Sequence, residues 1–166
     1  QAPFIRAVTV GTVQDLGITD INNMGAAMAP AAAKTLCQFF SDTRTRPEDY
    51  DMILTGDLGF VGSRLLERLM QAEGYPMAKL HNDCGLMIYD RKKQDVHAGG
   101  SGCGCAASVL CSFILPQIAC QRLKNVLFLA TGALMSPTST QQGESIPGIA
   151  HLVYLSSTPN PKEVIC

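Results

Sequence analysis

The sequence predicts an α/β fold in which helices cover a mixed β-sheet. Short apolar runs rich in β-branched residues alternate with helix-favouring segments, and the runs are apolar on both faces. Polar, glycine-containing loops follow these runs. No linker or internal repeat divides the 166 residues, so a single domain over 1–166 is expected. An apolar content of 46% is typical of a domain with a buried core.

The chain is predicted to open with a strand and a long helix. Phe4–Val13 is rich in β-branched residues and predicts a strand, which a polar loop over Asp15–Asn23 follows. The next segment predicts a helix that begins near Met24–Pro30 and ends near Ser41. Pro30 is expected in its first turn, where a missing N–H does no harm.

A second strand and helix follow. Asp51–Thr55 predicts a short buried strand, and Val61–Glu73 predicts an amphipathic helix. Asp57 is expected to cap this helix, and Arg64 to be solvated or paired. The expected buried face of the helix consists of four apolar residues: Val61, Leu65, Leu66 and Leu69.

The second half is predicted to hold one helix and two strands. Cys105–Leu123 predicts a helix that Pro116 kinks or divides. Asn125–Ala130 and Gly148–Ser156 predict strands, joined by a polar loop over Thr131–Pro147. Within the last strand, His151 is expected to be a hydrogen-bonded core histidine.

A glycine-rich segment lies in the long region Gly74–Gly104, which is predicted to be irregular. Residues 94–106 read QDVHAGGSGCGCA and run directly into the predicted helix. Glycines before a helix let several backbone N–H groups converge, which suits a phosphate or a carboxylate. The spacing matches neither common nucleotide-binding motif, so a small anionic ligand is the prediction.

Three further loops follow strand ends, where α/β folds usually place ligands: TGDLG (55–59), HNDCG (81–85) and TGALMS (131–136). Together with the glycine-rich segment they are candidates for one pocket. HNDCG has two interpretations. Cys84 could be a nucleophile with His81 as its base, or the segment is a tight turn with Gly85 at positive φ. The turn is favoured over catalysis, while ligand contact stays open.

The seven cysteines predict reduced thiols, as in a cytosol-like compartment, because the number is odd and no C-x-x-C occurs. Cys37, Cys111 and Cys120 are expected to be buried in apolar helices. A zinc site would need four residues whose spacing matches no common pattern, so no metal site is predicted. Those four residues are His81, His97, Cys103 and Cys105.

Charge and hydropathy exclude two classes of function. The net charge is −1 and no basic run exceeds Arg91–Lys93, so no nucleic-acid partner is expected. The longest apolar run, Cys105–Leu115, is too short to span a bilayer. Because Gln1 is not a natural start, the chain is expected to be a fragment.

Six segments together resemble the stage V sporulation protein AD family: NMGAAMAPAA (23–32), DYDMILTGDLGFVGSRLL (49–66), HNDCGLMIYD (81–90), HAGGSGCGCAAS (97–108), NVLFLATGALMS (125–136) and QGESIPGIAHLV (142–153). The resemblance implies a thiolase-like fold, related to ketoacyl synthase III, of which this chain is the C-terminal half. It further implies that the absent N-terminal half pairs with this chain, or that the chain associates with itself.

The same resemblance implies that condensing activity is lost. The histidine of the condensing enzymes falls at about Gly56, and their asparagine loop at about Gly100–Cys103, where no asparagine stands. Neither glycine nor serine replaces such a donor to a thioester oxyanion. A protein without catalytic residues or cofactor is therefore expected.

The resemblance implies a binding protein for dipicolinic acid, with calcium, that serves its uptake into the developing spore. The expected ligand contacts are His81, His97, Ser101 and Gly102, and in second place Thr55, Asp57 and Thr131. Other stage V sporulation membrane proteins are the implied partners, and peripheral attachment to the spore inner membrane the implied location. Two alternatives stay open: an acyl-transfer enzyme with a relocated site at Cys84 or Cys103, and a purely structural subunit of a membrane complex.

Overall fold

The computed structural model of the protein describes residues 3–99 and 102–159. Its strands form one sheet in the order β1-β5-β4-β2-β3. β5 is antiparallel to β1 and β4, whereas β2 is parallel to β4 and β3. The predicted α/β fold with a mixed sheet is therefore confirmed. The strands are β1 (Phe4–Thr9), β2 (Met52–Thr55), β3 (His81–Asp83), β4 (Asn125–Ala133) and β5 (Gly148–Ser156).

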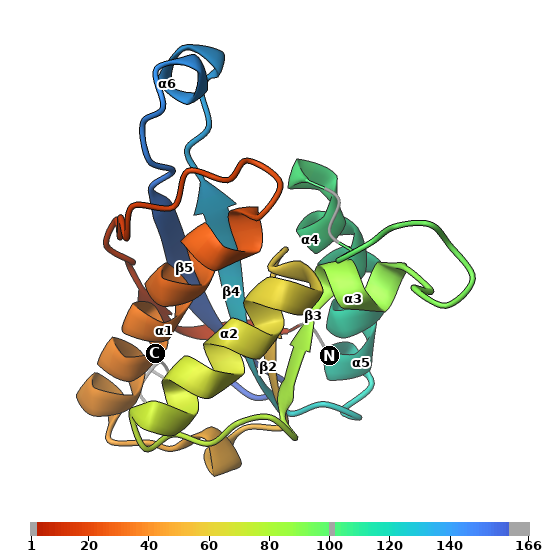
Figure 1. Ribbon diagram of the computed structural model, residues 1–166. Coiled ribbons are helices and arrows are strands. Elements are labelled where there is room, and N and C mark those ends of the chain that lie inside the picture. The colour runs from red at the N-terminus through yellow and green to blue at the C-terminus, as the bar shows by residue number, and fades with distance from the viewer. Residues whose placement is uncertain (1–2, 100–101, 160–166) are drawn as a thin grey trace.

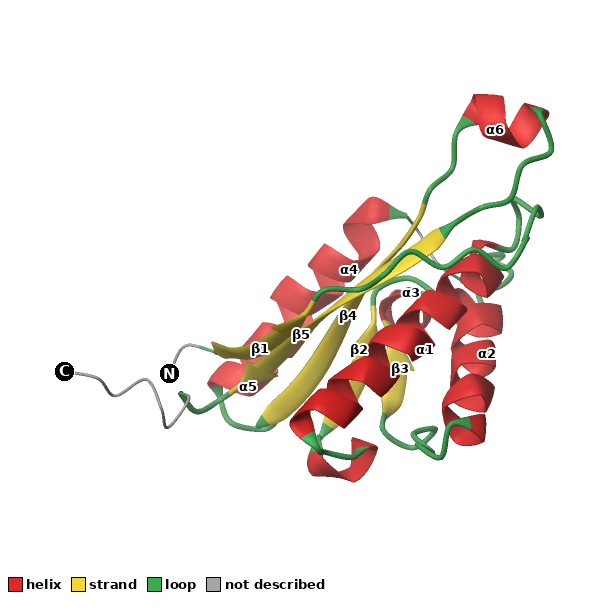
Figure 2. Ribbon diagram, turned by 90° about the vertical axis from the view of Figure 1, so that its left-hand side faces the viewer, coloured by secondary structure: helices red, strands yellow, loops and turns green. Residues whose placement is uncertain are grey.

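Helices cover both faces of the sheet (Figures 1 and 2). On one face lie α1 (Met24–Thr43) and α2 (Gly59–Ala72). On the other face, α4 (Cys103–Val109), a π-helical turn (Leu110–Ile114) and α5 (Leu115–Ala119) follow one another. Three shorter helices complete the fold: a 3-10 helix (Pro47–Asp49), α3 (Cys84–Ile88) and α6 (Pro137–Gln141), which projects beyond the sheet in Figure 2.

The core on the α1 and α2 side is aromatic at one end and tightly packed at the other. Phe39 packs with Phe40 and Tyr50 at ring-centroid distances of 5.9 Å each. Near their N-terminal ends the two helices approach through glycines, since a Cβ on Gly62 would lie 2.8 Å from the Cα atom of Gly25. Small residues therefore set how closely the helices pack, and so where the N-terminus of α2 lies.

The predicted C-terminal ends of two strands are wrong. β1 stops at Thr9 because its pairing with β5 ends there, and the exposed Val10 and Val13 lie outside the strand. β4 extends to Ala133, where it still pairs with Gly148.

Two predictions for the helices on this side also need correction. Pro30 lies in the interior of α1 instead of its first turn, so the helix accepts a missing N–H there. On α2, Leu66 is buried and Leu65 and Leu69 are partly buried, whereas Val61 is 45% exposed.

The region Gly74–Gly104 is more regular than predicted. It contains β3, α3 and the first residues of α4. β3 has three residues, too few for a sequence pattern to show, and it exists because it pairs in parallel with β2. Farther along, the helical path is divided as predicted, since the π-helical turn ends just before Pro116. There Leu115 donates its N–H to Leu110, one residue farther back than in an α-helix.

The predicted environments of four side chains are wrong. His151 is exposed, although its Nδ1 accepts a hydrogen bond from the Gly11 N–H at 3.0 Å. Cys37 is only partly buried, and Cys111 and Cys120 are exposed. The buried thiols are instead Cys84 and Cys105.

Candidate functional site

The three strand-end loops meet at one edge of the sheet. Thr131 on β4 accepts a hydrogen bond from the Asp57 N–H at 3.1 Å. The Asp57 carboxylate in turn accepts one from the Gly102 N–H at 2.8 Å. At the end of β3, the Asp83 carboxylate accepts hydrogen bonds from the Leu58 and Gly59 N–H groups at 2.8 and 3.0 Å. The structure thus brings together the three loops and the described part of the glycine-rich segment.

A cavity of about 390 Å³ opens at this edge. The turn before α1 forms one wall through Asn22 and Asn23, and the Asp57–Gly59 loop forms another. The glycine-rich segment closes it with Ala98, Gly99 and Gly102. Of the predicted ligand contacts that the structure describes, Asp57 and Gly102 lie in the cavity lining, while the Thr131 hydroxyl accepts a hydrogen bond from the loop.

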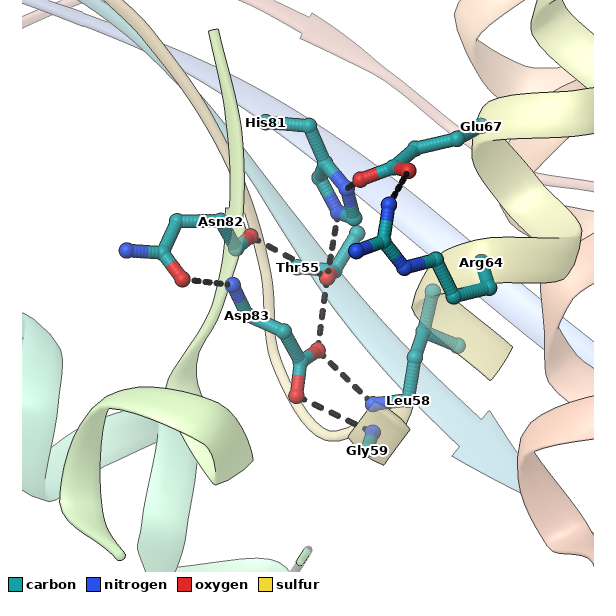
Figure 3. A network of polar contacts seen from close by, with 8 residues as sticks. All are labelled: Thr55, Leu58, Gly59, Arg64, Glu67, His81, Asn82 and Asp83. Atoms are coloured by element: carbon teal, nitrogen blue, oxygen red, sulfur yellow. Dashed lines mark hydrogen bonds and ion pairs between the residues drawn. The ribbon is translucent and has the colours of Figure 1, made fainter. Parts of the chain in front are cut away.

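His81 and Thr55 lie beneath the cavity and not in its lining. The His81 side chain is 1% exposed, and its Nε2 lies 3.0 Å from the Thr55 hydroxyl. Thr55 is fully buried and donates to the Asp83 carboxylate at 2.6 Å. The other ring nitrogen of His81 lies 3.4 Å from Glu67 (Figure 3). These side chains support the Asp57–Gly59 loop through Asp83, which accepts hydrogen bonds from Thr55 and from the Leu58 and Gly59 N–H groups.

His97 and Ser101 take no described part in the cavity. The His97 side chain is 91% exposed, and its backbone has a φ of 46°. Its carbonyl accepts a hydrogen bond from Arg91 at 2.9 Å, so the residue serves the loop through its backbone. Ser101 lies outside the described residues.

Asp83 is the residue at this edge that sequence reasoning missed. Asp57 was the expected cap of α2, but the N-cap position is Leu58, which makes no side-chain cap. The carboxylate of Asp83 takes that role from the neighbouring strand, and it also caps α3 through the Gly85 N–H at 3.1 Å. The prediction that Arg64 is solvated or paired is confirmed, since it is exposed and forms a 3.0 Å ion pair with Glu67.

HNDCG is not the tight turn that the sequence favours. It runs from strand β3 into helix α3, and Gly85 lies inside the helix without a positive φ. The Cys84 side chain is fully buried, and this burial, more than the nearby carboxylates, raises the pKa of its thiol to about 12. A thiol at such a pKa is protonated at neutral pH, so it is no nucleophile in this state.

No metal centre is found in residues 3–99 and 102–159. Among these residues no group of three or more histidine, cysteine, aspartate or glutamate side chains could hold an ion. Of the conceivable zinc set, His81 is buried against Thr55 and His97 is exposed on a loop. The Cys103 side chain lies outside the description.

The buried His81 predicts a dependence of stability on pH. Burial lowers the pKa of His81, and the hydrogen bond and charge of Glu67 oppose this only in part. The folded protein therefore binds fewer protons than the unfolded chain below a pH of about 6.5. We expect the free energy of unfolding to hold this contribution above that pH, and to lose it as the pH falls through the folded-state pKa of His81.

Urea denaturation between pH 5 and 8 measures this effect, with His81→Gln as the matched variant. The variant lacks the ring, so the difference between the two curves isolates the contribution of His81. A difference that does not change with pH would contradict the prediction. Glu67→Gln removes the largest influence that raises the pKa of His81, so the loss of stability should begin at the same pH but continue to lower pH and become larger.

Comparisons with known proteins agree with the resemblance seen in the sequence. Residues 1–156 match the family model described as Stage V sporulation protein AD (SpoVAD). The chain is 53% identical over 147 residues to Stage V sporulation protein AD of Bacillus subtilis (strain 168). The match covers 89% of this chain and 43% of the relative, so the chain spans less than half of the relative's length.

Proposed function

Because the chain belongs to the stage V sporulation protein AD family, we propose that it forms part of a non-catalytic protein that binds dipicolinic acid for its uptake into the developing spore. The observation that carries the proposal is the 390 Å³ cavity at the strand ends, which has the size of a small-ligand site. The side-chain amides of Asn22 and Asn23 can donate to ligand carboxylates there.

Calcium is proposed to accompany the ligand. The Asp57 carboxylate lines the cavity and would repel a free dicarboxylate at close range. A calcium ion carried by the ligand offsets this repulsion, and carboxylate and amide oxygens are ligands that it accepts. Asn22, Asn23 and Asp57 are the described side chains that offer such oxygens in the lining.

The packing around Gly56 supports the absence of condensing activity. A Cβ at Gly56 would meet Ala106, Leu129 and Thr131 atoms at 3.3 Å, and the residue is buried. Two of these three contacts are backbone atoms, so an imidazole there would displace strand β4. The buried, protonated thiol of Cys84 also supports the absence of condensing activity.

Calorimetric titration of the full-length protein tests the proposal. Dipicolinate is titrated with and without calcium, acyl-CoA is titrated in parallel, and chain 1–166 serves as a second sample. We expect saturable dipicolinate binding that calcium strengthens, and none of acyl-CoA. Binding of acyl-CoA alone would overturn the proposal in favour of an acyl-transfer enzyme, and binding of neither would favour a structural subunit.

An interface for the rest of the protein is proposed along β1. This strand is at the edge of the sheet; its Ile5 and Val8 are 64% and 58% exposed, and Val10, which follows the strand, is 77% exposed. An exposed edge strand with large apolar side chains is prone to pairing. We expect chain 1–166 alone to self-associate in analytical ultracentrifugation, and Val8→Lys to reduce this. A monomer at all concentrations would contradict the prediction.

The proposed location is the periphery of the spore inner membrane, reached through other stage V sporulation membrane proteins. Within the described residues, no helix has the length and apolarity that crossing a bilayer requires. Co-purification of the full-length protein with such partners from spore membranes tests the proposal. Recovery in the soluble fraction, without partners, would contradict it.

A further inference from the structure

A chain of buried polar contacts runs from the surface of α2 to the loop that lines the cavity (Figure 3). It starts at Glu67, passes through His81 and Thr55, and ends at Asp83, with contacts of 3.4, 3.0 and 2.6 Å. His81, Thr55 and Asp83 are each at most 1% exposed in their side chains or as residues. Buried polar groups with this many partners fix one arrangement of the backbone around them.

We propose that Asp83 is a positioning residue for the cavity, and that Thr55 and His81 hold it in place. Asp83 accepts hydrogen bonds from four donors on three segments: the Thr55 hydroxyl and the N–H groups of Leu58, Gly59 and Gly85. Two of these donors belong to the Asp57–Gly59 loop, which lines the cavity. The inference rests on the proposed function only where it concerns ligand binding.

The position of the Asp57–Gly59 loop also determines the position of the glycine-rich segment. Gly59 lies against the Ala98 carbonyl, which also accepts a hydrogen bond from the Phe60 N–H at 2.7 Å. A shift of the Leu58 and Gly59 backbone therefore moves Ala98, which also lines the cavity. Asp83 thus fixes two walls, although it is not in the lining itself.

The hydrogen atoms available explain the roles of Thr55 and His81. An ionised carboxylate only accepts, so the single hydroxyl hydrogen of Thr55 goes to Asp83 across the 2.6 Å contact. Thr55 must then accept from the Nε2–H of His81. In the neutral ring Nδ1 then carries no hydrogen, so its 3.4 Å contact with Glu67 becomes a hydrogen bond only when the ring is protonated. His81 therefore orients the hydroxyl that holds Asp83.

Hydrogen–deuterium exchange of the full-length protein, with and without Asp83→Asn, tests the positioning role directly. The asparagine keeps the shape but puts two N–H donors where the carboxylate accepts. We expect the peptide spanning residues 56–62 to exchange about tenfold faster, and the dissociation constant for dipicolinate to rise about tenfold. Asp95→Asn is the matched control, because Asp95 is 94% exposed, and it should change neither.

If Asp83→Asn does not fold, two milder substitutions at Thr55 test the same role. Thr55→Val removes the hydroxyl and should show the same two effects, and Thr55→Ser should restore both. Unchanged exchange at residues 56–62 in Asp83→Asn and Thr55→Val would overturn the positioning role. Faster exchange with unchanged dipicolinate affinity would overturn the link to the cavity. If the unaltered protein binds no dipicolinate, the proposed function fails, while the exchange result still decides the positioning role.

Discussion

Replacing Gly62 by alanine is expected to lower the free energy of unfolding by about 3 kcal/mol. The added Cβ would lie 2.8 Å from both the Cα and the carbonyl oxygen of Gly25. These are backbone atoms of α1, so no flexible side chain can move aside. Helices α1 and α2 would have to separate, which exposes the core beneath them. Urea denaturation of Gly62→Ala against the unaltered chain measures the effect.

Gly104→Ala is the matched control for this substitution. Gly104 also lies in a helix, but it is exposed and nothing stands within 4 Å of its added Cβ. Alanine there should leave stability unchanged or raise it by up to about 1 kcal/mol, since alanine favours helix. Equal losses from both substitutions would contradict the argument, because the effect would then not come from the contact with Gly25.

The sequence was sufficient to predict the elements that have a regular pattern. β5 was predicted with its observed bounds and β2 within one residue, because buried strands show as apolar runs closed by polar or glycine-containing turns. The ends of β1 and β4 were missed because a neighbouring strand, not local propensity, decides where pairing stops.

The edge of the sheet that holds the cavity was predictable, but the role of each side chain was not. Loops after parallel strands meet at one edge in any such fold, which brought Asp57, Thr131 and Gly102 together as expected. Whether a side chain lines the cavity or lies beneath it depends on how deeply it is buried. Motif spacing carries no information about this depth. His81 and Thr55 were therefore assigned to the ligand although they are buried.

The role of Asp83 was also not predictable, because its partners are distant in the sequence. As a residue of HNDCG it was read as a turn former, and its hydrogen bonds to Leu58 and Gly59 span 25 and 24 positions. No local pattern reports a carboxylate on one strand that caps the helix after another strand. A useful signal was nevertheless present, since the TGDLG loop precedes a helix without a capping residue at the position that needs one.

Replacing Gly59 by alanine should weaken both the fold and dipicolinate binding. Gly59 has a φ of 61°, which an alanine adopts at a loss of about 1–2 kcal/mol. Its Cβ would also lie 2.9 Å from the carbonyl oxygen of Ala98, in the wall of the cavity. The 98–99 segment must then move away from the Asp57–Gly59 loop. We expect the dissociation constant for dipicolinate in the full-length protein to rise about tenfold, as when a buried hydrogen bond is lost.

Gly74→Ala separates the two effects of that substitution. Gly74 has a φ of 82° but nothing within 4 Å of an added Cβ, so it shares the backbone strain without the contact. It should lower the free energy of unfolding by a similar 1–2 kcal/mol, about the strain of a left-handed alanine, while calorimetry finds dipicolinate affinity unchanged. If Gly59→Ala also leaves the affinity unchanged, the ligand does not contact this wall. If both glycines weaken binding equally, the loss comes from stability and not from the shape of the cavity.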